Sequence, residues 1–225
     1  GGIFRNAGQV CVAGSRLLVE ASIHDAFVAA VAEASEAMRV GDPLKIDTHI
    51  GAINSENQLK ANLGFVDTAQ TEGGQVITGG SRILEETGGY YMAPTIVTGV
   101  TREATLAQKE VFGPVLSTVR MDNYEDALNL VKDNAYGNGT AIYTADGDTA
   151  RDFANRVNVG MVGINFPIPV PLSYHTFGGW KKSAFGDLNQ YGPDAFRFYT
   201  RTKTVTQRWF SGIKEGGEFN FKAMD

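Results

Sequence analysis

The sequence has little of several features that mark other classes of protein. One cysteine among 225 residues excludes an intrachain disulfide and is typical of a reducing compartment. Three histidines, His24, His49 and His175, lie far apart without the spacing of zinc ligands, so we expect no metal site. No run of 18 apolar residues occurs, which predicts no membrane helix. We therefore expect a cytoplasmic protein without a membrane partner.

The charge is nearly balanced and evenly distributed. Twenty basic and 25 acidic residues leave a net charge of −5, and no basic block is present. A nucleic-acid partner would require a basic face, so we expect none. The chain is 43% hydrophobic and 20% charged, which is enough to bury the core of one large domain, or of one domain with an appendage.

Strand-like and helix-like segments alternate along most of the chain. Ser22 is the expected N-cap of a helix that ends near Met38, and Asp122 with Glu125 forms the capping box expected for a later helix. Further helices are expected from Ser55 to about residue 72 and over 146–157. The expected strands are 16–20, 75–78, 95–97, 115–120, 140–143 and 159–165. The alternation predicts an α/β fold, a mostly parallel sheet covered by helices.

The last quarter of the chain follows a different pattern. Residues 167–172, PIPVPL, contain too many prolines for a regular element. Residues 202–209 alternate in the manner of a strand, which we interpret as an oligomer contact. Gly137 and Gly139 precede a strand and lack a third glycine, so they indicate a turn rather than a dinucleotide-binding loop.

Cys11 is the first residue with a candidate chemical role. The surrounding GQVCVAG segment has little side-chain crowding, so a thiolate there can approach a substrate while neighbouring N–H groups face a developing oxyanion. A buried structural cysteine is the competing interpretation.

Three motifs point to one family. FRNAGQVCVAGSR resembles the active-site segment of the aldehyde dehydrogenase superfamily, F-x-N-x-G-Q-x-C. The matching residues are Phe4, Asn6, Gly8, Gln9 and Cys11. The resemblance implies that Cys11 is the catalytic nucleophile.

The other two motifs follow in the family's order. QKEVFGPV resembles E-x-F-G-P, which implies that Glu110 binds the nicotinamide ribose hydroxyls and that Phe112 packs beside the nicotinamide. HTFGGWKKSAFGD resembles P-F-G-G-x-K-x-S, which implies that Phe177 lines the substrate pocket. A solvated glutamate and a core phenylalanine are the competing interpretations of Glu110 and Phe177.

The resemblance covers essentially the whole chain. It implies a catalytic domain over residues 1–195 and an oligomerisation tail over 196–225, whose strand assembles a homodimer or homotetramer. In the family an NAD-binding domain precedes this segment and supplies the base and the asparagine oxyanion donor, so we expect the chain alone not to turn over aldehyde.

The implied reaction proceeds through covalent intermediates. A thiohemiacetal on the cysteine gives up a hydride to NAD, or to NADP, and the resulting thioester is released by water or by coenzyme A.

The branch within the family remains open at this point. Long runs, including VGMVGINFPIPVPL and TRTKTVTQRW, resemble the CoA-acylating methylmalonate-semialdehyde dehydrogenases. In that branch the nucleophile is preceded by E-R, and the resemblance implies that this arginine binds the substrate carboxylate. Here Val10 stands in that position and cannot donate a hydrogen bond. GQVC is instead the form usual in the water-using enzymes. Malonate semialdehydes converted to acyl-CoA and a simple aldehyde converted to free acid therefore both remain.

Two readings from other classes are also kept. A non-catalytic half-enzyme can act as an assembly partner that docks through its C-terminal strand. A thiol hydrolase requires a histidine base, for which His175 is the candidate.

Overall fold

The computed structural model describes residues 2–209. Its helices are α1 (His24–Glu36), α2 (Glu56–Thr71), α3 (Thr105–Gln108), α4 (Tyr124–Asp133), α5 (Gly147–Arg156) and α6 (Asp194–Tyr199), with short 3-10 turns at Arg5–Gly8 and Glu85–Thr87. Its strands are β1 (Arg16–Glu20), β2 (Gln75–Thr78), β3 (Arg82–Ile83), β4 (Tyr91–Met92), β5 (Thr95–Thr98), β6 (Val115–Met121), β7 (Tyr136–Gly137), β8 (Gly139–Ile142), β9 (Met161–Ile164) and β10 (Trp180–Lys181).

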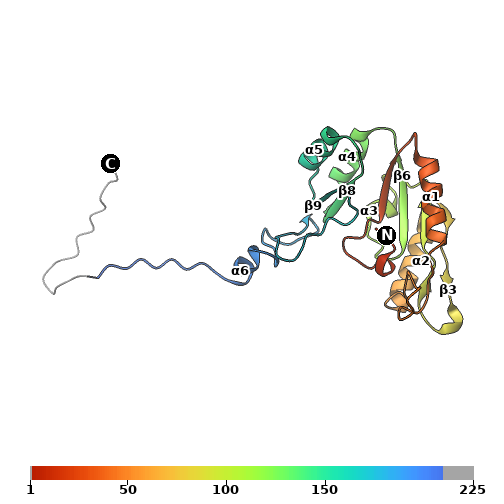
Figure 1. Ribbon diagram of the computed structural model, residues 1–225, viewed down its shortest axis with the longest axis horizontal. Helices are drawn as coiled ribbons and strands as arrows, with labels where there is room; N and C mark the ends of the chain where they lie inside the picture. Colours follow the sequence, from red (N-terminus) through yellow and green to blue (C-terminus); the bar gives the residue numbers. More distant parts are fainter. Residues whose placement is uncertain (1, 210–225) are drawn as a thin grey trace.

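A four-stranded sheet in the order β1-β6-β5-β2 forms the framework of the first half (Figure 1). β6 pairs in parallel with both β1 and β5, and its residues 115–119 are buried on both faces. A strand covered on both sides needs apolar or hydrogen-bonded residues throughout, which the sequence VLSTV supplies. β6 is therefore an interior strand of the sheet, as β5 is, and it holds in place the segments that precede and follow it.

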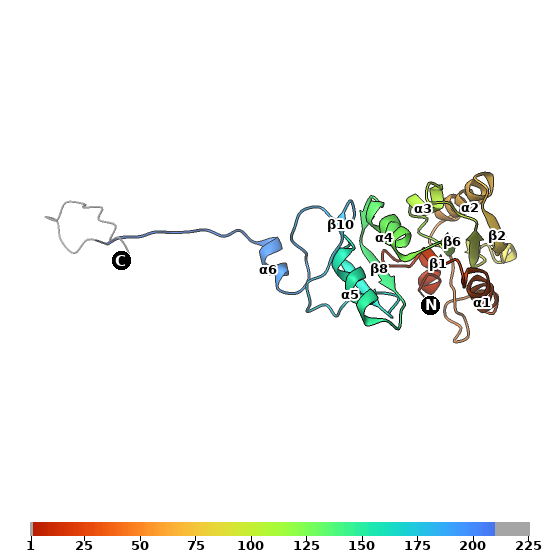
Figure 2. The ribbon, with the colours of Figure 1, turned by 90° about the horizontal axis from the view of Figure 1, so that it is seen from above.

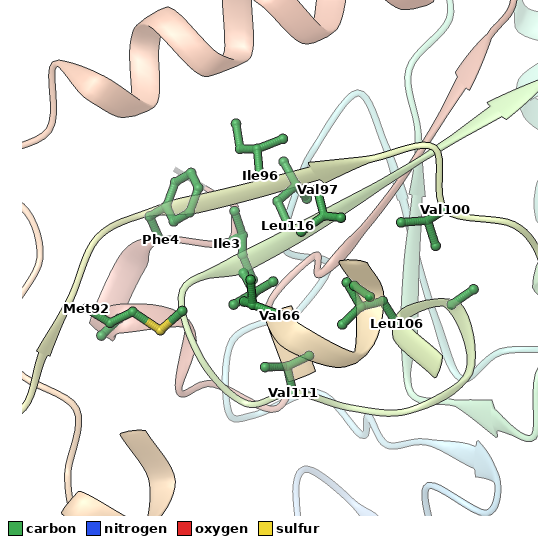
Figure 3. Close-up of a cluster of buried hydrophobic side chains, with 14 of the residues drawn as sticks. Ile3, Phe4, Val66, Met92, Ile96, Val97, Val100, Leu106, Val111 and Leu116 are labelled. Carbon is green, nitrogen blue, oxygen red and sulfur yellow. The ribbon is translucent and has the colours of Figure 1, made fainter. Parts of the chain in front are cut away.

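Helices cover both faces of this sheet. In Figure 2 the sheet runs between α1 on one side and α2 with α3 on the other. Apolar side chains from the sheet, from α2 and from the loops close the core, and Figure 3 shows Ile96, Val97 and Leu116 of the strands beside Val66 and Leu106 of the helices. Burying each such side chain contributes about 1.5–3 kcal/mol to folding.

The four-stranded sheet is mixed, with two parallel strand pairs and one antiparallel pair at its edge. β2 pairs antiparallel with β5, and β3 pairs antiparallel with β4. The connection from β2 to β5 runs through the β3–β4 hairpin without a crossover helix, and short connections of this kind return the chain antiparallel. The prediction of an α/β sheet with helices is confirmed, and the β2–β5 pair is the antiparallel exception to the expected mostly parallel arrangement.

A second, smaller unit follows β6. β8 and β9 pair in parallel, with α5 as the crossover between them, and β7 pairs antiparallel with β10. Its small core contains Leu128, Phe153, Val157 and Val159.

A polar cluster joins α4 to α5 in this unit. The Tyr124 hydroxyl donates to the Asp152 carboxylate over 2.8 Å. Burial, and then this hydrogen bond, raise the pKa of Tyr124 to about 12. Arg156 donates to both Glu125 and Asp152, so the two helices are tied together by charge as well as by packing.

Both expected N-caps are displaced by short distances. The Ser22 hydroxyl donates to Glu20 instead of capping, and α1 begins after Ile23. The cap of α4 is Asn123, whose side chain accepts from Asp126 N–H over 2.9 Å, rather than Asp122. Asn123 caps α4 one position after the expected residue, whereas Ile23 at the start of α1 makes no side-chain cap hydrogen bond.

The chain after β9 is largely irregular. In Figures 1 and 2 residues 200–209, which follow α6, run away from the folded body. Residues 202–209 form no hydrogen-bonded strand with any other part of residues 2–209, so the expected oligomer strand stays a prediction. The rest of the expected 196–225 tail, from residue 210, lies outside the described residues. No helix in the described part is long and apolar enough to cross a membrane.

Candidate active site

Cys11 is exposed in a tight turn immediately before β1. Ala13 N–H donates to the carbonyl of Val10 over 3.0 Å, which places Cys11 and Val12 in the two central positions of the turn. The interpretation of Cys11 as a buried structural cysteine is therefore wrong. A thiol at the apex of a turn, near the end of a framework strand, is open to a small reactant.

The residues before the turn anchor it to the core. Ile3 and Phe4 are buried beside Met92 and Leu116, as Figure 3 shows, and Phe4 is only 3% exposed. The chain then turns through Asn6 and Ala7, both with φ near +50°, a conformation that costs about 1–2 kcal/mol for each non-glycine residue. The Asn6 amide offsets part of this by donating to the carbonyl of Gln9 over 3.0 Å.

The nucleophile segment rests directly on the second motif. Gly8, at φ +71°, packs against the backbone of Gly113, where a Cβ on Gly8 would overlap the Gly113 carbonyl. Gln9 fixes the same segment on another side, because its side-chain oxygen accepts from Asn54 N–H over 3.0 Å. The fold thus brings together two motifs separated by about a hundred residues in the sequence.

Two polar side chains of α2 hold the second motif in place. The Gln58 amide donates to the carbonyls of Val111 and Phe112 over 3.0 and 3.1 Å. Asn62 is fully buried beneath Gly113, where a Cβ would overlap its amide. Sequence reasoning missed both residues, although polar groups four apart on an otherwise amphipathic helix are the available signal.

Glu110 and Phe112 present their side chains outward from this loop. Phe112 has φ +55° and is 37% exposed. The Glu110 carboxylate is exposed, and it accepts no hydrogen bond from residues 2–209. The Arg16 guanidinium holds this loop by donating to the carbonyl of Lys109 over 3.1 Å. Burial lowers the pKa of Arg16, and the negative charge of Glu110 acts in the opposite direction. An exposed carboxylate and an exposed aromatic ring two positions apart in one loop can accept hydrogen bonds from hydroxyl groups and pack against a flat ring.

A residue of the second unit reaches the nucleophile turn. The Asn138 amide donates to the carbonyl of Cys11 over 2.8 Å. Asn138 lies between β7 and β8, in the stretch that the sequence indicates as a turn. Nothing in the sequence pattern marks Asn138, since a long-range contact to a backbone carbonyl has no local signal.

The third motif docks on the same stretch. Phe177 is half-buried and stacks on Tyr191, with ring centroids 4.4 Å apart. The Ser183 hydroxyl accepts from Gly137 N–H over 3.0 Å. Lys181 Nζ donates to the carbonyls of Lys132 and Asn134 at the end of α4, over 2.8 and 2.9 Å, and burial lowers its pKa.

The described histidines take part in other contacts. His24 is buried beside Asp25, and His49 accepts from Arg39 N–H. His175 contacts the Tyr174 ring and makes no hydrogen bond to Cys11 among residues 2–209. The described part of the chain holds no group of three or more histidine, cysteine or acidic side chains arranged for a metal ion. A Cys–His hydrolase pair therefore has no support from this geometry.

Comparison with known proteins identifies the family to which these motifs belong. The model of the aldehyde dehydrogenase family matches residues 1–205. The chain belongs to the aldehyde dehydrogenase family. The resemblance inferred from the three motifs is thereby confirmed.

Individual relatives refine the comparison. Malonate-semialdehyde dehydrogenase of Pseudomonas aeruginosa is 38% identical over the whole chain, which spans 46% of that relative. The structure of a putative methylmalonate-semialdehyde dehydrogenase from Sinorhizobium meliloti, complexed with NAD, superposes on 96% of the chain and 44% of its own length, with a TM-score of 0.89 and 41% identity. The structure of indole-3-acetaldehyde dehydrogenase of P. syringae, in complex with NAD⁺, superposes with a TM-score of 0.85 at 38% identity. The superposition covers 91% of the chain and 41% of the length of that relative. The chain therefore spans less than half the length of each of these relatives.

Proposed function

We propose that this chain carries the nucleophile and one edge of the cofactor site of an NAD-dependent aldehyde dehydrogenase. The observation that carries the proposal is the backbone contact between Gly8 and Gly113. It joins the turn that presents Cys11 to the loop that presents Glu110 and Phe112. An oxidation at a carbon bound to sulfur needs a hydride acceptor next to the nucleophile, and this contact keeps the two segments in a fixed relation.

The chemistry assigned to Cys11 follows from its turn. The thiolate adds to the aldehyde carbonyl carbon, so a C–S bond forms and the carbonyl oxygen becomes an oxyanion. The backbone N–H of Cys11 donates to no group among residues 2–209, and it is therefore available to that oxyanion. The product of this step is a thiohemiacetal on Cys11.

Glu110 and Phe112 are assigned to the cofactor. The free Glu110 carboxylate accepts hydrogen bonds from the ribose hydroxyls, and the Phe112 ring packs beside the nicotinamide and excludes water. When bound, the cofactor supplies the hydride acceptor, and a thioester on Cys11 remains. Gln58, Asn62 and Arg16 keep the loop in position. Phe177 is assigned to the substrate side, where its stacking on Tyr191 fixes the ring.

The substrate we propose first is malonate or methylmalonate semialdehyde, converted to an acyl-CoA. Support comes from the semialdehyde dehydrogenases, which match the chain at 38% and 41% identity. A simple aldehyde oxidised to a free acid is the second candidate, favoured by Val10. Valine stands next to the nucleophile where a carboxylate-binding branch carries arginine, and it offers no donor to a second carboxylate.

Product analysis separates the two candidates. Full-length protein containing this chain is given malonate semialdehyde or propanal with NAD, with and without coenzyme A, and the products are identified by mass. Acyl-CoA formed only when coenzyme A is present supports the first candidate. Free acid formed without coenzyme A supports the second.

The same assay tests whether catalysis is the function at all. A Cys11→Ser variant is the matched control, since it keeps the size of the side chain but weakens the nucleophile. Full-length protein that forms no NADH with any aldehyde, and whose Cys11→Ser variant assembles normally, would favour the assembly-partner function. The docking segment in that case would be 202–209, whose Val205 and Trp209 are exposed.

A further inference from the structure

The carbonyl of the nucleophile is held from a distant part of the chain. Asn138 lies 127 positions after Cys11, and its amide nitrogen is 2.8 Å from the Cys11 oxygen. This bond joins the turn, which is anchored in the first core, to the second unit. It is a side-chain contact to backbone, so it acts on the path of the chain at Cys11 and not on the sulfur directly.

Hydrogen bonds hold the backbone of Asn138 and of the preceding residue in place. Gly137 N–H donates to the Ser183 hydroxyl, and Gly160 N–H donates to the carbonyl of Gly137 over 2.9 Å. Met161 N–H donates to the carbonyl of Asn138 over 3.1 Å. A donor mounted on such a framework loses little freedom when it bonds, so its position defines the position of its acceptor.

The bond completes the restraint of the Cys11 turn. The carbonyl of Val10 accepts from Ala13 N–H, and the carbonyl of Cys11 accepts from Asn138. The peptide units on both sides of Cys11 are therefore oriented, and with them the direction of the Cα–Cβ bond and of the Cys11 N–H. These two vectors decide where the thiol and the oxyanion donor point.

We propose that Asn138 is a positioning residue for the nucleophile, acting through the carbonyl of Cys11. The proposal rests on the proposed function, in which Cys11 forms the covalent intermediates. It also gives Ser183 of the third motif an indirect part, because Ser183 holds the segment that carries Asn138.

Alkylation of Cys11 measures the effect without turnover. Cys11 is the single cysteine of the 225 residues. The extent of iodoacetamide labelling of the Cys11 peptide, measured by mass spectrometry at a series of pH values, therefore reports the reactivity of that thiol alone. Asn138→Asp keeps the shape of the side chain but replaces the donor with a carboxylate. We expect Cys11 in this variant to be alkylated more slowly at every pH, because the carboxylate repels the Cys11 carbonyl that the amide held and the turn no longer presents the thiol in one direction.

Turnover in the full-length protein gives the second readout. Asn138→Ala removes the donor without adding charge. We expect about a tenfold loss of kcat/KM for the aldehyde, the change that corresponds to one hydrogen bond of about 1.4 kcal/mol, with an unchanged KM for NAD.

Asn134→Asp is the matched control. The Asn134 amide donates to the carbonyl of Ala107 from the segment just before β7, and its side chain makes no hydrogen bond to Cys11 among residues 2–209. We expect this variant to lower the unfolding midpoint while its alkylation profile stays that of the unmodified protein.

Two results would overturn the positioning role. One is an Asn138→Asp profile that matches the unmodified protein while stability falls as in Asn134→Asp. The other is an Asn138→Ala variant with full kcat/KM. Failure of the proposed function is distinct from both, since it would appear as no NADH formation with any aldehyde, or as NADH formation that survives Cys11→Ser.

Discussion

Gly8 and Gly113 pack backbone against backbone, with no space for a side chain on Gly8. The nitrogen of Pro114 lies 2.9 Å from the position of a Cβ on Gly8, so the whole Gly113–Pro114 peptide blocks it. Gly8 belongs to the motif that contains Cys11, and Gly113 comes directly after Phe112 in the candidate cofactor loop. One backbone contact therefore sets the separation between the candidate nucleophile and the candidate cofactor loop.

Gly8→Ala is expected to destabilise the protein strongly. Its φ of +71° costs an alanine about 1–2 kcal/mol, and the overlap with Gly113 adds about 1–3 kcal/mol. Gly88→Ala is the matched control, because Gly88 has φ +73° and no atom within 4 Å of its Cβ position. Urea unfolding of the two variants measures the difference, and equal losses would show that the Gly8–Gly113 contact is not tight.

Gln58→Leu is expected to loosen the cofactor loop. The substitution removes the donor that the carbonyls of Val111 and Phe112 share, and leaving such groups unpaired costs about 1–3 kcal/mol. We expect the Kd for NAD of the full-length protein to rise about tenfold while iodoacetamide labelling of Cys11 is unchanged. Gln70→Leu, an exposed position on the same helix, controls for the change in residue type. Unaltered NAD affinity in Gln58→Leu would contradict the role given to this residue.

Tyr124 makes stability depend on pH in the alkaline range. Its pKa is raised to about 12 in the fold, against about 10 for an unfolded phenol. Between those values the folded state keeps a proton that the unfolded state releases. The contribution of Tyr124 is therefore complete below pH about 10 and lost as the pH rises toward 12.

The comparison of Tyr124→Phe with the unmodified protein checks this dependence. Urea unfolding from pH ~8 to pH ~12 is expected to show a shallower alkaline decline in the variant. Tyr143→Phe, at an exposed tyrosine, is expected to keep the full decline. Identical slopes in all three proteins would contradict the assignment.

Local patterns in the sequence predict most of the elements. Strands 16–20 and 75–78 are as expected to the residue, and the helix expected over 146–157 is α5, Gly147–Arg156. These segments are bounded by turn residues and carry one clear periodicity, so their limits depend on neighbours in the sequence. The exposure of Cys11 also agrees with a segment poor in bulky side chains.

Contacts between distant segments were beyond prediction. The antiparallel edge strand β2 depends on the β3–β4 hairpin, whose strands have two residues each and too little pattern to detect. The bonds from Gln58 to Phe112 and from Asn138 to Cys11 join residues 54 and 127 positions apart. The motifs named Glu110 and Phe112, but only the fold shows which side chains hold them in position.

If Cys11 forms the covalent intermediate, that intermediate can be trapped on its sulfur. Full-length protein is mixed with malonate semialdehyde and NAD, without coenzyme A, quenched in acid within a turnover and digested for mass spectrometry. We expect an acyl mass increment on the peptide that contains Cys11, dependent on NAD and absent from Cys11→Ser. NADH formation without that increment, or an increment on another residue, would contradict it.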